Sequence, residues 1–219
     1  MLASAIAFIL LLFYKNTQVT QQQAGDKHEI DWSAVVRRPN FIIAVSAAAI
    51  GYGVMSFVMT ATPLAMHEMM GHSLDSTKWV IQSHILAMFL PSLFAPLLIR
   101  WFRIKGLMVV GLLAYACCAG IASVNSSLMG YWGSLILLGV GWNFLFLAGT
   151  TLLPLSYRQG EQFKVQGFND AVVFSLQAVA SLSAGWLISA AGWSTILLGV
   201  FPLLLLLGLM IALVSIPGR

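Results

Sequence analysis

The chain has 219 residues, of which 59% are hydrophobic and only 8% are charged, and its mean hydropathy is +0.90. A soluble domain carries about 25% charged residues, so this composition excludes a soluble globular protein and predicts one embedded in a membrane. The net charge of +4 does not indicate a nucleic-acid partner, because the basic residues lie in short segments between apolar runs. Cys117 and Cys118 are adjacent within an apolar run, and we interpret both as packing residues.

The N-terminal run MLASAIAFILLLFY is too short to cross a bilayer and lacks the positive region of a signal peptide. We interpret residues 1–14 as the end of a longer, partial transmembrane helix. Residues 15–40 form the longest polar segment, which we expect to be a cytoplasmic linker that joins two halves. Near its end, Trp32 is expected at headgroup level, with Arg37 and Arg38 facing lipid phosphates.

Six apolar stretches follow, each close to the roughly 20 residues that a helix needs to cross the hydrocarbon. They are far longer than a barrel strand of roughly ten residues, so we expect helices. The predicted fold is an all-α transmembrane six-helix bundle over residues 41–216, followed by a cytoplasmic tail, 217–219. The expected spans are 41–66, 79–99, 107–124, 130–154, 168–188 and 193–216.

The basic residues are distributed unevenly over the loops between these spans. If the linker is cytoplasmic, ten of the eleven Lys and Arg residues lie on the cytoplasmic side, and only Lys78 lies outside. Cytoplasmic loops carry an excess of positive charge, so both ends of the six-helix unit are predicted to be cytoplasmic. We expect a multi-pass protein of a bacterial inner membrane.

The loop after the second expected span reads APLLIRWFRIKG over residues 95–106. Arg100 and Arg103 fall on the two arginine positions of G-x-x-x-D-R-x-G-R-[KR], a cytoplasmic loop motif of the major facilitator superfamily, although its glycines and aspartate are replaced. Residues 139–174, GVGWNFLFLAGTTLLPLSYRQGEQFKVQGFNDAVVF, are similar to the region of helices ten and eleven in bacterial members. The chain thus resembles the C-terminal half of such a transporter, with helices seven to twelve and the end of helix six. The two arginines either take part in gating or anchor the loop to anionic lipid.

This resemblance implies a secondary active transporter of a small solute or drug-like molecule, which works by alternating access with ion (proton) coupling, and it implies no cofactor. Its partners would be the bilayer, the substrate, and either a missing N-terminal half or a second copy of the chain. A single half would expose its cavity to lipid, so we expect a truncated product of a longer transporter. The alternative on the same fold is a non-transporting membrane scaffold or receptor-like protein.

Four polar residues are expected near the membrane midplane when residues are counted inward at about 1.5 Å each. Tyr52, Ser56, Asn143 and Gln177 either contact substrate in a cavity or hydrogen-bond between helices. Trp142 beside Asn143 either stacks on a ligand or packs.

Two titratable residues within the spans are candidates for proton coupling or gating. Asp170 is the only acidic residue inside an expected span, about one turn from its cytoplasmic end, where a structural role at the helix start is the alternative. His84 lies about two turns below the outer face and has an unperturbed pKa suited to a proton switch.

The segment LAMHEMMGHSLD, residues 64–75, is similar to the zinc-protease pattern H-E-x-x-H. However, His67 and His72 are five residues apart, about 140° around a helix, and Gly71 weakens the turn between them. The sequence therefore argues against an intramembrane metalloprotease or any metal site, and we interpret the segment as an extracellular turn.

Overall fold

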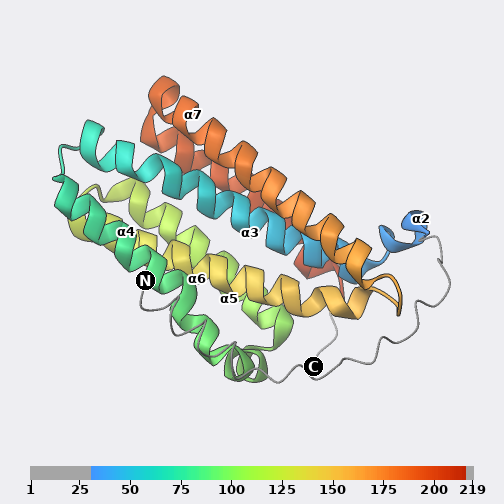
Figure 1. Cartoon of the computed structure of the whole chain (residues 1–219). Coiled ribbons are helices and arrows are strands. Elements are labelled where there is room, and N and C mark those ends of the chain that lie inside the picture. The colour runs from blue at the N-terminus through green and yellow to red at the C-terminus, as the bar shows by residue number, and fades with distance from the viewer. Residues whose placement is uncertain (1–30, 216–219) are drawn as a thin grey trace, which may run out of the picture. The chain divides into compact units, whose positions relative to one another are not determined.

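The computed structural model describes residues 31–215, and every regular element in that range is a helix (Figure 1). The expectations for residues 1–14, for most of the linker and for the tail 217–219 lie outside the described residues. The elements are α2 (Trp32–Val35), α3 (Pro39–Pro63), η1 (Leu64–Met69), α4 (Leu74–Phe89), η2 (Leu90–Phe94), α5 (Ala95–Val124), α6 (Leu128–Leu152), η3 (Leu153–Ser156) and α7 (Gln162–Leu213). Of these, η1 is a π-helix that extends α3, while η2 and η3 are 3-10 helices.

The described residues contain four continuous helical stretches that are long and apolar enough to cross a membrane: Pro39–Met69, Leu74–Val124, Leu128–Ser156 and Gln162–Leu213. The second and fourth have 51 and 52 residues, more than twice the length that one crossing requires. Each contains one residue with a positive φ, Arg103 (φ 57°) and Gly192 (φ 78°), at which the helix is broken. Figure 1 shows the chain reversing within α7. The number of continuous helices is therefore four rather than the six expected, because two of them each combine two consecutive expected spans.

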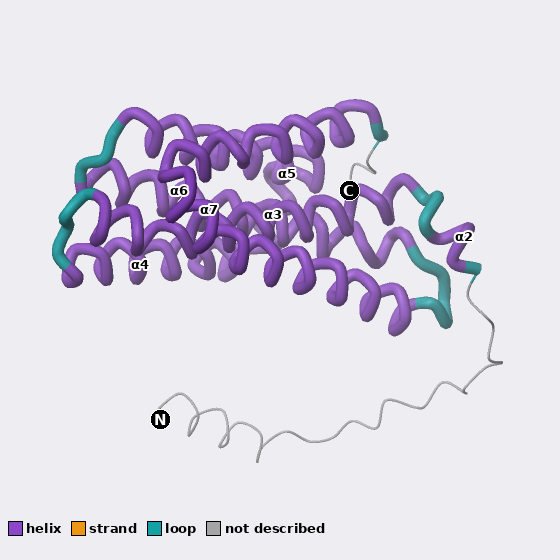
Figure 2. Tube along the Cα trace, turned by 90° about the horizontal axis from the view of Figure 1, so that it is seen from above, coloured by secondary structure: helices purple, strands orange, loops and turns teal. Residues whose placement is uncertain are grey.

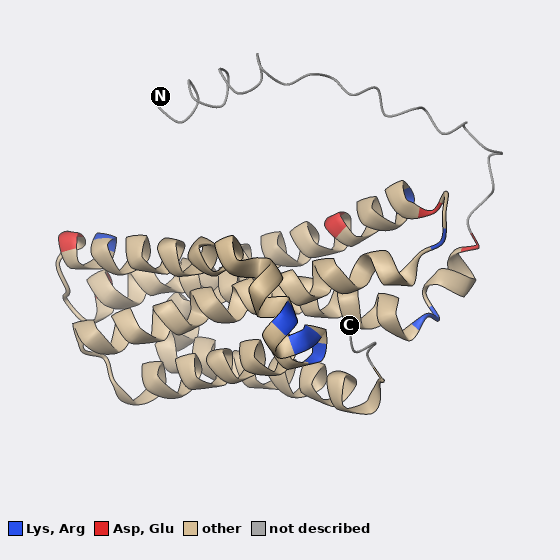
Figure 3. Cartoon of the chain, turned by 90° about the horizontal axis from the view of Figure 1, so that it is seen from below, with Lys and Arg blue, Asp and Glu red and all other residues tan. Residues whose placement is uncertain are grey.

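Hydrogen bonds identify which turns lie at the same end of the helix bundle. Figure 2 shows the bundle as a tube along the Cα trace. Arg38 Nη1 donates to Ser156 O at 2.9 Å, and Lys105 Nζ donates to Val214 O at 3.4 Å. Seven of the eight described Lys and Arg residues belong to the turns and helix starts of this end, which we call the basic end: Arg37, Arg38, Arg100, Arg103, Lys105, Arg158 and Lys164. At the opposite end His72 Nε2 lies 3.0 Å from Ser126 O. Figure 3 shows that long stretches of the helices between the two ends carry no charge.

Glycines allow α6 to approach its neighbours closely. A Cβ atom on Gly149 would lie 2.8 Å from the carbonyl oxygen of Ala44 in α3, and one on Gly139 would lie 2.8 Å from that of His84 in α4. A Cβ on Gly141 would lie 3.0 Å from a backbone oxygen of α5. Small residues permit this close backbone contact in membrane helices, so α6 is the helix on which α3, α4 and α5 pack.

The second segment of α7, residues 193–213, presents apolar side chains outward. Leu198, Leu205 and Leu209 are exposed and recur at helical spacing, whereas Ile196, Leu207 and other residues of the opposite face are buried. Exposed leucines on a spanning helix are stable where they face lipid tails. This part of the surface therefore suits contact with the bilayer.

Candidate functional site

Five aromatic side chains from four helices form one cluster, which we call the aromatic cluster. The ring of Tyr52 in α3 has its centroid 5.2 Å from that of Trp142, 5.7 Å from that of Phe146 and 5.9 Å from that of Phe174. Trp142 in turn lies 5.8 Å from Phe89 of α4 and 5.3 Å from Phe146, on which it stacks. These distances are typical of favourable aromatic pairs. The cluster joins α3, α4, α6 and the first segment of α7.

The aromatic cluster lies deep between the two ends of the bundle. Tyr52 is 13 residues after the start of α3 at Pro39, and Phe174 is 12 residues after the start of α7 at Gln162. At about 1.5 Å per residue, both rings lie roughly 20 Å from the basic end. This depth is near the middle of helices of membrane-spanning length, where a transported solute must be held.

Part of the aromatic cluster is open to a ligand. Phe89 and Phe174 are 58% and 55% exposed, while Trp142 is only 5% exposed. The indole Nε1 of Trp142 is buried and has no hydrogen-bond partner within the described part of the chain. A buried donor without a partner costs about 1–3 kcal/mol. The exposed rings of Phe89 and Phe174 can therefore offer flat surfaces for stacking, whereas the N–H group of Trp142 is enclosed by protein.

Polar residues continue this surface along α7. Asp170, Phe174, Gln177 and Ser181 are spaced by four, three and four residues, so they share one helix face. Asp170 is exposed and accepts a hydrogen bond from Asn169 Nδ2 at 3.1 Å, while Gln177 is half-buried. The structure thus places three predicted residues, Tyr52, Gln177 and Asp170, on or beside the aromatic cluster.

The predicted residues Ser56, Asn143 and His84 lie deeper in the packing. Ser56 is buried one turn after Tyr52 on α3. Asn143 Nδ2 donates to Met88 O at 2.7 Å, beside the break between α4 and η2, and leaves its Oδ1 without a partner among the described residues. His84 is fully buried, with Nδ1 2.7 Å from Leu135 O. Asn143 and His84 therefore connect α4 to α6 through contacts that suit interhelical adhesion.

The turn at residues 70–73 is fixed by hydrogen bonds between histidines and backbone. His67 Nδ1 lies 2.9 Å from His72 O, and Gly71 adopts a positive φ of 69° that ends the helix. Within residues 31–215 no group of three or more His, Cys, Asp or Glu residues could hold a metal ion. The histidines of LAMHEMMGHSLD thus have a structural use in joining two turns.

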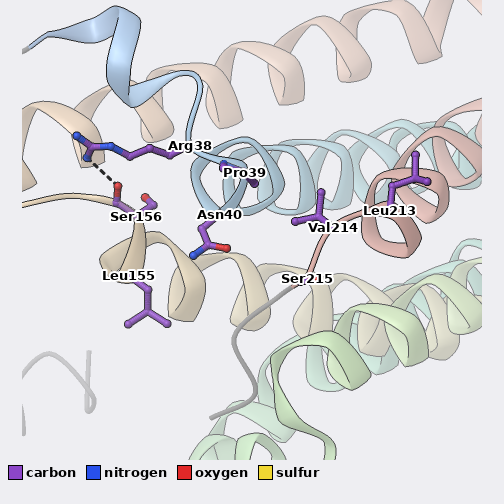
Figure 4. Close-up of a pocket in the computed structure, with 8 residues that line it drawn as sticks. All are labelled: Arg38, Pro39, Asn40, Leu155, Ser156, Leu213, Val214 and Ser215. Atoms are coloured by element: carbon purple, nitrogen blue, oxygen red, sulfur yellow. Dashed lines mark hydrogen bonds between the residues drawn. The ribbon is translucent and has the colours of Figure 1, made fainter.

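An ion pair joins three elements at the basic end. Arg38 Nη1 lies 2.6 Å from Glu161 Oε2, and Arg38 also donates to the carbonyl oxygen of Ser156. The hydrogen bonds that Arg38 donates to the Glu161 carboxylate lower the pKa of Glu161 and raise the pKa of Arg38. A cavity of about 500 Å³ opens beside this pair; Figure 4 shows its lining residues: Arg38, Pro39, Asn40, Leu155, Ser156, Leu213, Val214 and Ser215. The pair holds the start of α3 against the loop between η3 and α7.

Sequence reasoning missed Phe89, Phe146 and Phe174, because an aromatic residue in an apolar span is indistinguishable from a packing residue. The spacings of Phe146 four residues after Trp142, and of Gln177 three residues after Phe174, put each pair on one helix face. These spacings are the only features of the sequence that could have indicated the cluster. Whether the face of α6 meets the face of α7 depends on tertiary packing.

Comparison with known proteins gives a consistent family. The sequence profile of the Major Facilitator Superfamily matches residues 1–180. The riboflavin transporter RfnT of Brucella anthropi is 42% identical over 183 residues, which are 84% of this chain and 44% of RfnT. Two uncharacterized MFS-type transporters of Bacillus subtilis, YdeG and YddS, are 29% identical over 217 residues and 30% identical over 190 residues.

The alignments with YdeG and YddS cover 94% and 84% of this chain but 50% and 43% of those proteins. The chain therefore spans about half the length of the curated relatives it matches. No solved structure matches it. The family profile, the transporter relatives and the apolar helices all indicate an integral membrane protein of a transporter family rather than an enzyme. The chain belongs to the Major Facilitator Superfamily.

Proposed function

We propose that this chain forms one half of a secondary transporter for a planar aromatic solute, with riboflavin as the first candidate. The observation that carries the proposal is the aromatic cluster, in which four helices bring five rings together at mid-depth with two of them more than half exposed. The name of the relative RfnT, a riboflavin transporter, supports the choice of a flat heteroaromatic solute.

The chemistry of the cluster matches such a solute. A flat tricyclic ring gains contact area and favourable stacking against Tyr52 and Phe174, at about 0.5–1.5 kcal/mol per aromatic pair beyond area burial. The side chain of riboflavin carries several hydroxyl groups, for which the half-buried amide of Gln177 is a suitable partner. Mixed aromatic and polar lining of this kind is typical of small-molecule sites.

Alternating access requires a second bundle against the face that carries the aromatic cluster. We propose that this partner is a second six-helix half, since the relatives are about twice as long, with a second copy of the chain as the alternative. The basic end is proposed to face the cytoplasm of a bacterial inner membrane, following the excess of Lys and Arg there.

Proton coupling is proposed to depend on Asp170 rather than on His84. Asp170 is exposed on the helix face of α7 that also carries Phe174, whereas His84 is buried with one ring nitrogen bound to Leu135 O. An exposed carboxylate on a cavity face can exchange protons as the cavity opens to each side. Uptake driven by an imposed proton gradient should be lost in Asp170→Asn and kept in a control, Asp75→Asn.

The site itself is tested by binding of riboflavin to the purified chain, followed through quenching of flavin fluorescence. Phe174→Ala should weaken binding about threefold to tenfold, because one stacking partner of about 1 kcal/mol is lost. Phe163→Ala is the matched control, since Phe163 is also an exposed phenylalanine of α7 but lies near its start. Equal affinity of the two variants would contradict the proposed site.

Transport is tested separately, by riboflavin uptake in a riboflavin-requiring bacterium that expresses the chain alone or with a complementary six-helix half. We expect growth on low riboflavin when the chain is expressed alone or together with the complementary half. We expect this growth to be lost when the chain carries Phe174→Ala. Binding without uptake in both arms would favour the non-transporting scaffold or receptor-like alternative.

A further inference from the structure

A second cavity lies on a different set of helices from the aromatic cluster. It is a groove of about 490 Å³ between the second segment of α5, residues 104–124, and the second segment of α7. Its lining residues are Lys105, Val109, Leu112, Leu113, Ala116, Phe201, Leu204, Leu205, Gly208, Ile211 and Ala212. Ten of these eleven residues are apolar, and the exception is Lys105 at one end.

The length and direction of the groove fit one leaflet of a bilayer. From Lys105 to Ala116 the helix rises about 16 Å, which is close to half of the roughly 30 Å hydrocarbon thickness. The two helix segments are antiparallel, so Lys105 lies beside Ala212 and the groove ends near Phe201. The groove therefore runs from the basic end to about the middle of the membrane.

The charge at the mouth of the groove favours an anion. Arg100, Arg103 and Lys105 lie within six residues, and neither α5 nor the second segment of α7 contains an acidic residue. Lys105 is exposed, and its bond within residues 31–215 is a long one of 3.4 Å to Val214 O, so its ammonium group has further N–H groups for an acceptor. The helix also restarts after Arg103, which directs the positive end of its dipole toward the same place.

We propose that this groove binds an anionic phospholipid, with one acyl chain between the two helix segments and the phosphate on Lys105. Leu113 and Leu205, exposed by 58% and 68%, form the rims that hold the chain. Gly208 leaves the floor without a side chain; a Cβ there would be in ordinary van der Waals contact with Leu112 Cδ1, at 3.8 Å across the groove. The basic loop thereby gains a specific lipid contact in addition to general attraction to an anionic surface.

Native mass spectrometry of the delipidated 219-residue chain in detergent tests the proposal, with phosphatidylglycerol and phosphatidylethanolamine as the two probes. Phosphatidylglycerol should bind more tightly than phosphatidylethanolamine, and Lys105→Gln should weaken it about fivefold, equivalent to about 1 kcal/mol. Lys78→Gln, at the opposite end, is the matched control and should change nothing. Equal binding of the two lipids, or equal losses in the two lysine variants, would overturn the proposal.

The acyl-chain part is tested by filling the groove. Gly208→Leu and Ala116→Leu should each reduce binding of both lipids, while the melting temperature in lipid-free detergent shows that the variants fold. Glycerol 3-phosphate should not displace the lipid, because it lacks the chain; displacement would show a headgroup site only. If Gly208→Leu instead converts a dimer into a monomer in the same spectra, the groove is a protein interface and the lipid proposal is wrong.

Discussion

At the scale of single residues, one ion pair joins elements that are distant in sequence. Arg38 and Glu161 are 123 residues apart, yet their two hydrogen bonds measure 2.6 and 3.2 Å. Their side chains are only 22% and 16% exposed, so water screens this pair less than a pair at an open surface. A bidentate arginine–carboxylate contact of this kind is among the stronger ion pairs.

Loss of this pair should destabilise the protein in a pH-dependent way. Because the folded pKa of Glu161 lies below its ordinary 4.5, its stabilising contribution is fully present above pH 4.5 and is lost as the pH falls through the lowered value. Glu161→Gln should cost about 1 kcal/mol at pH 7 and remove this part of the acid sensitivity. Thermal unfolding in detergent from pH 7 to pH 3 measures both effects. Asp75→Asn, which breaks the exposed ion pair with Lys78, should change the stability very little at pH 7.

At the scale of helices, α6 packs through small residues as well as through the hydrogen bonds of Asn143 and His84. The backbone of Gly149 approaches that of α3 so closely that a Cβ would lie 2.8 Å from Ala44 O and 3.1 Å from Ala48 N. These neighbours are backbone atoms, which cannot rotate away, so a larger residue must separate the two helices.

Gly149→Ala should therefore destabilise the protein by about 1–3 kcal/mol, the usual cost of overpacking. Gly120→Ala is the matched control, because Gly120 lies in α5 with no atom within 4 Å of its would-be Cβ. There alanine should be neutral or stabilising by about 1 kcal/mol through its better helix propensity. Guanidine- or heat-induced unfolding in the same detergent compares the two variants, and similar losses in both would contradict the packing argument.

At the scale of the whole molecule, the separation of charge predicts how the bundle lies in the membrane. The turn containing Gln159 belongs to the basic end and the turn containing Ser126 to the opposite end, and both residues are exposed. In a background in which both native cysteines are alanine, Ser126→Cys should react with a membrane-impermeant maleimide in intact cells. Gln159→Cys should react only after permeabilisation, and the reverse pattern would overturn the proposed orientation.

Much of the architecture could be predicted from sequence, because apolar runs of membrane-spanning length admit few structures other than helices. The break at Gly71, the second and third spans meeting near Arg103, and the basic end all follow from local composition. Sequence reasoning also selected Asp170 and Gln177 as candidate site residues, since a polar group is easily recognised in an apolar span. Phe174 was not selected, because an apolar ring there has the same sequence signature whether it faces lipid, core or cavity.

The sequence by itself determined the membrane environment, the helical class and the uneven charge, since these depend on composition and on spacing along one chain. Only the tertiary structure decided that Tyr52, Trp142 and Phe174 meet at one depth, and that His84 and Asn143 bond α4 to α6. It also decided that Lys105 lies at one end of an apolar groove. The physical reason is that helix rotation and contact are set by side-chain packing and by glycines that admit a neighbouring backbone, and neither has a local signature in the sequence.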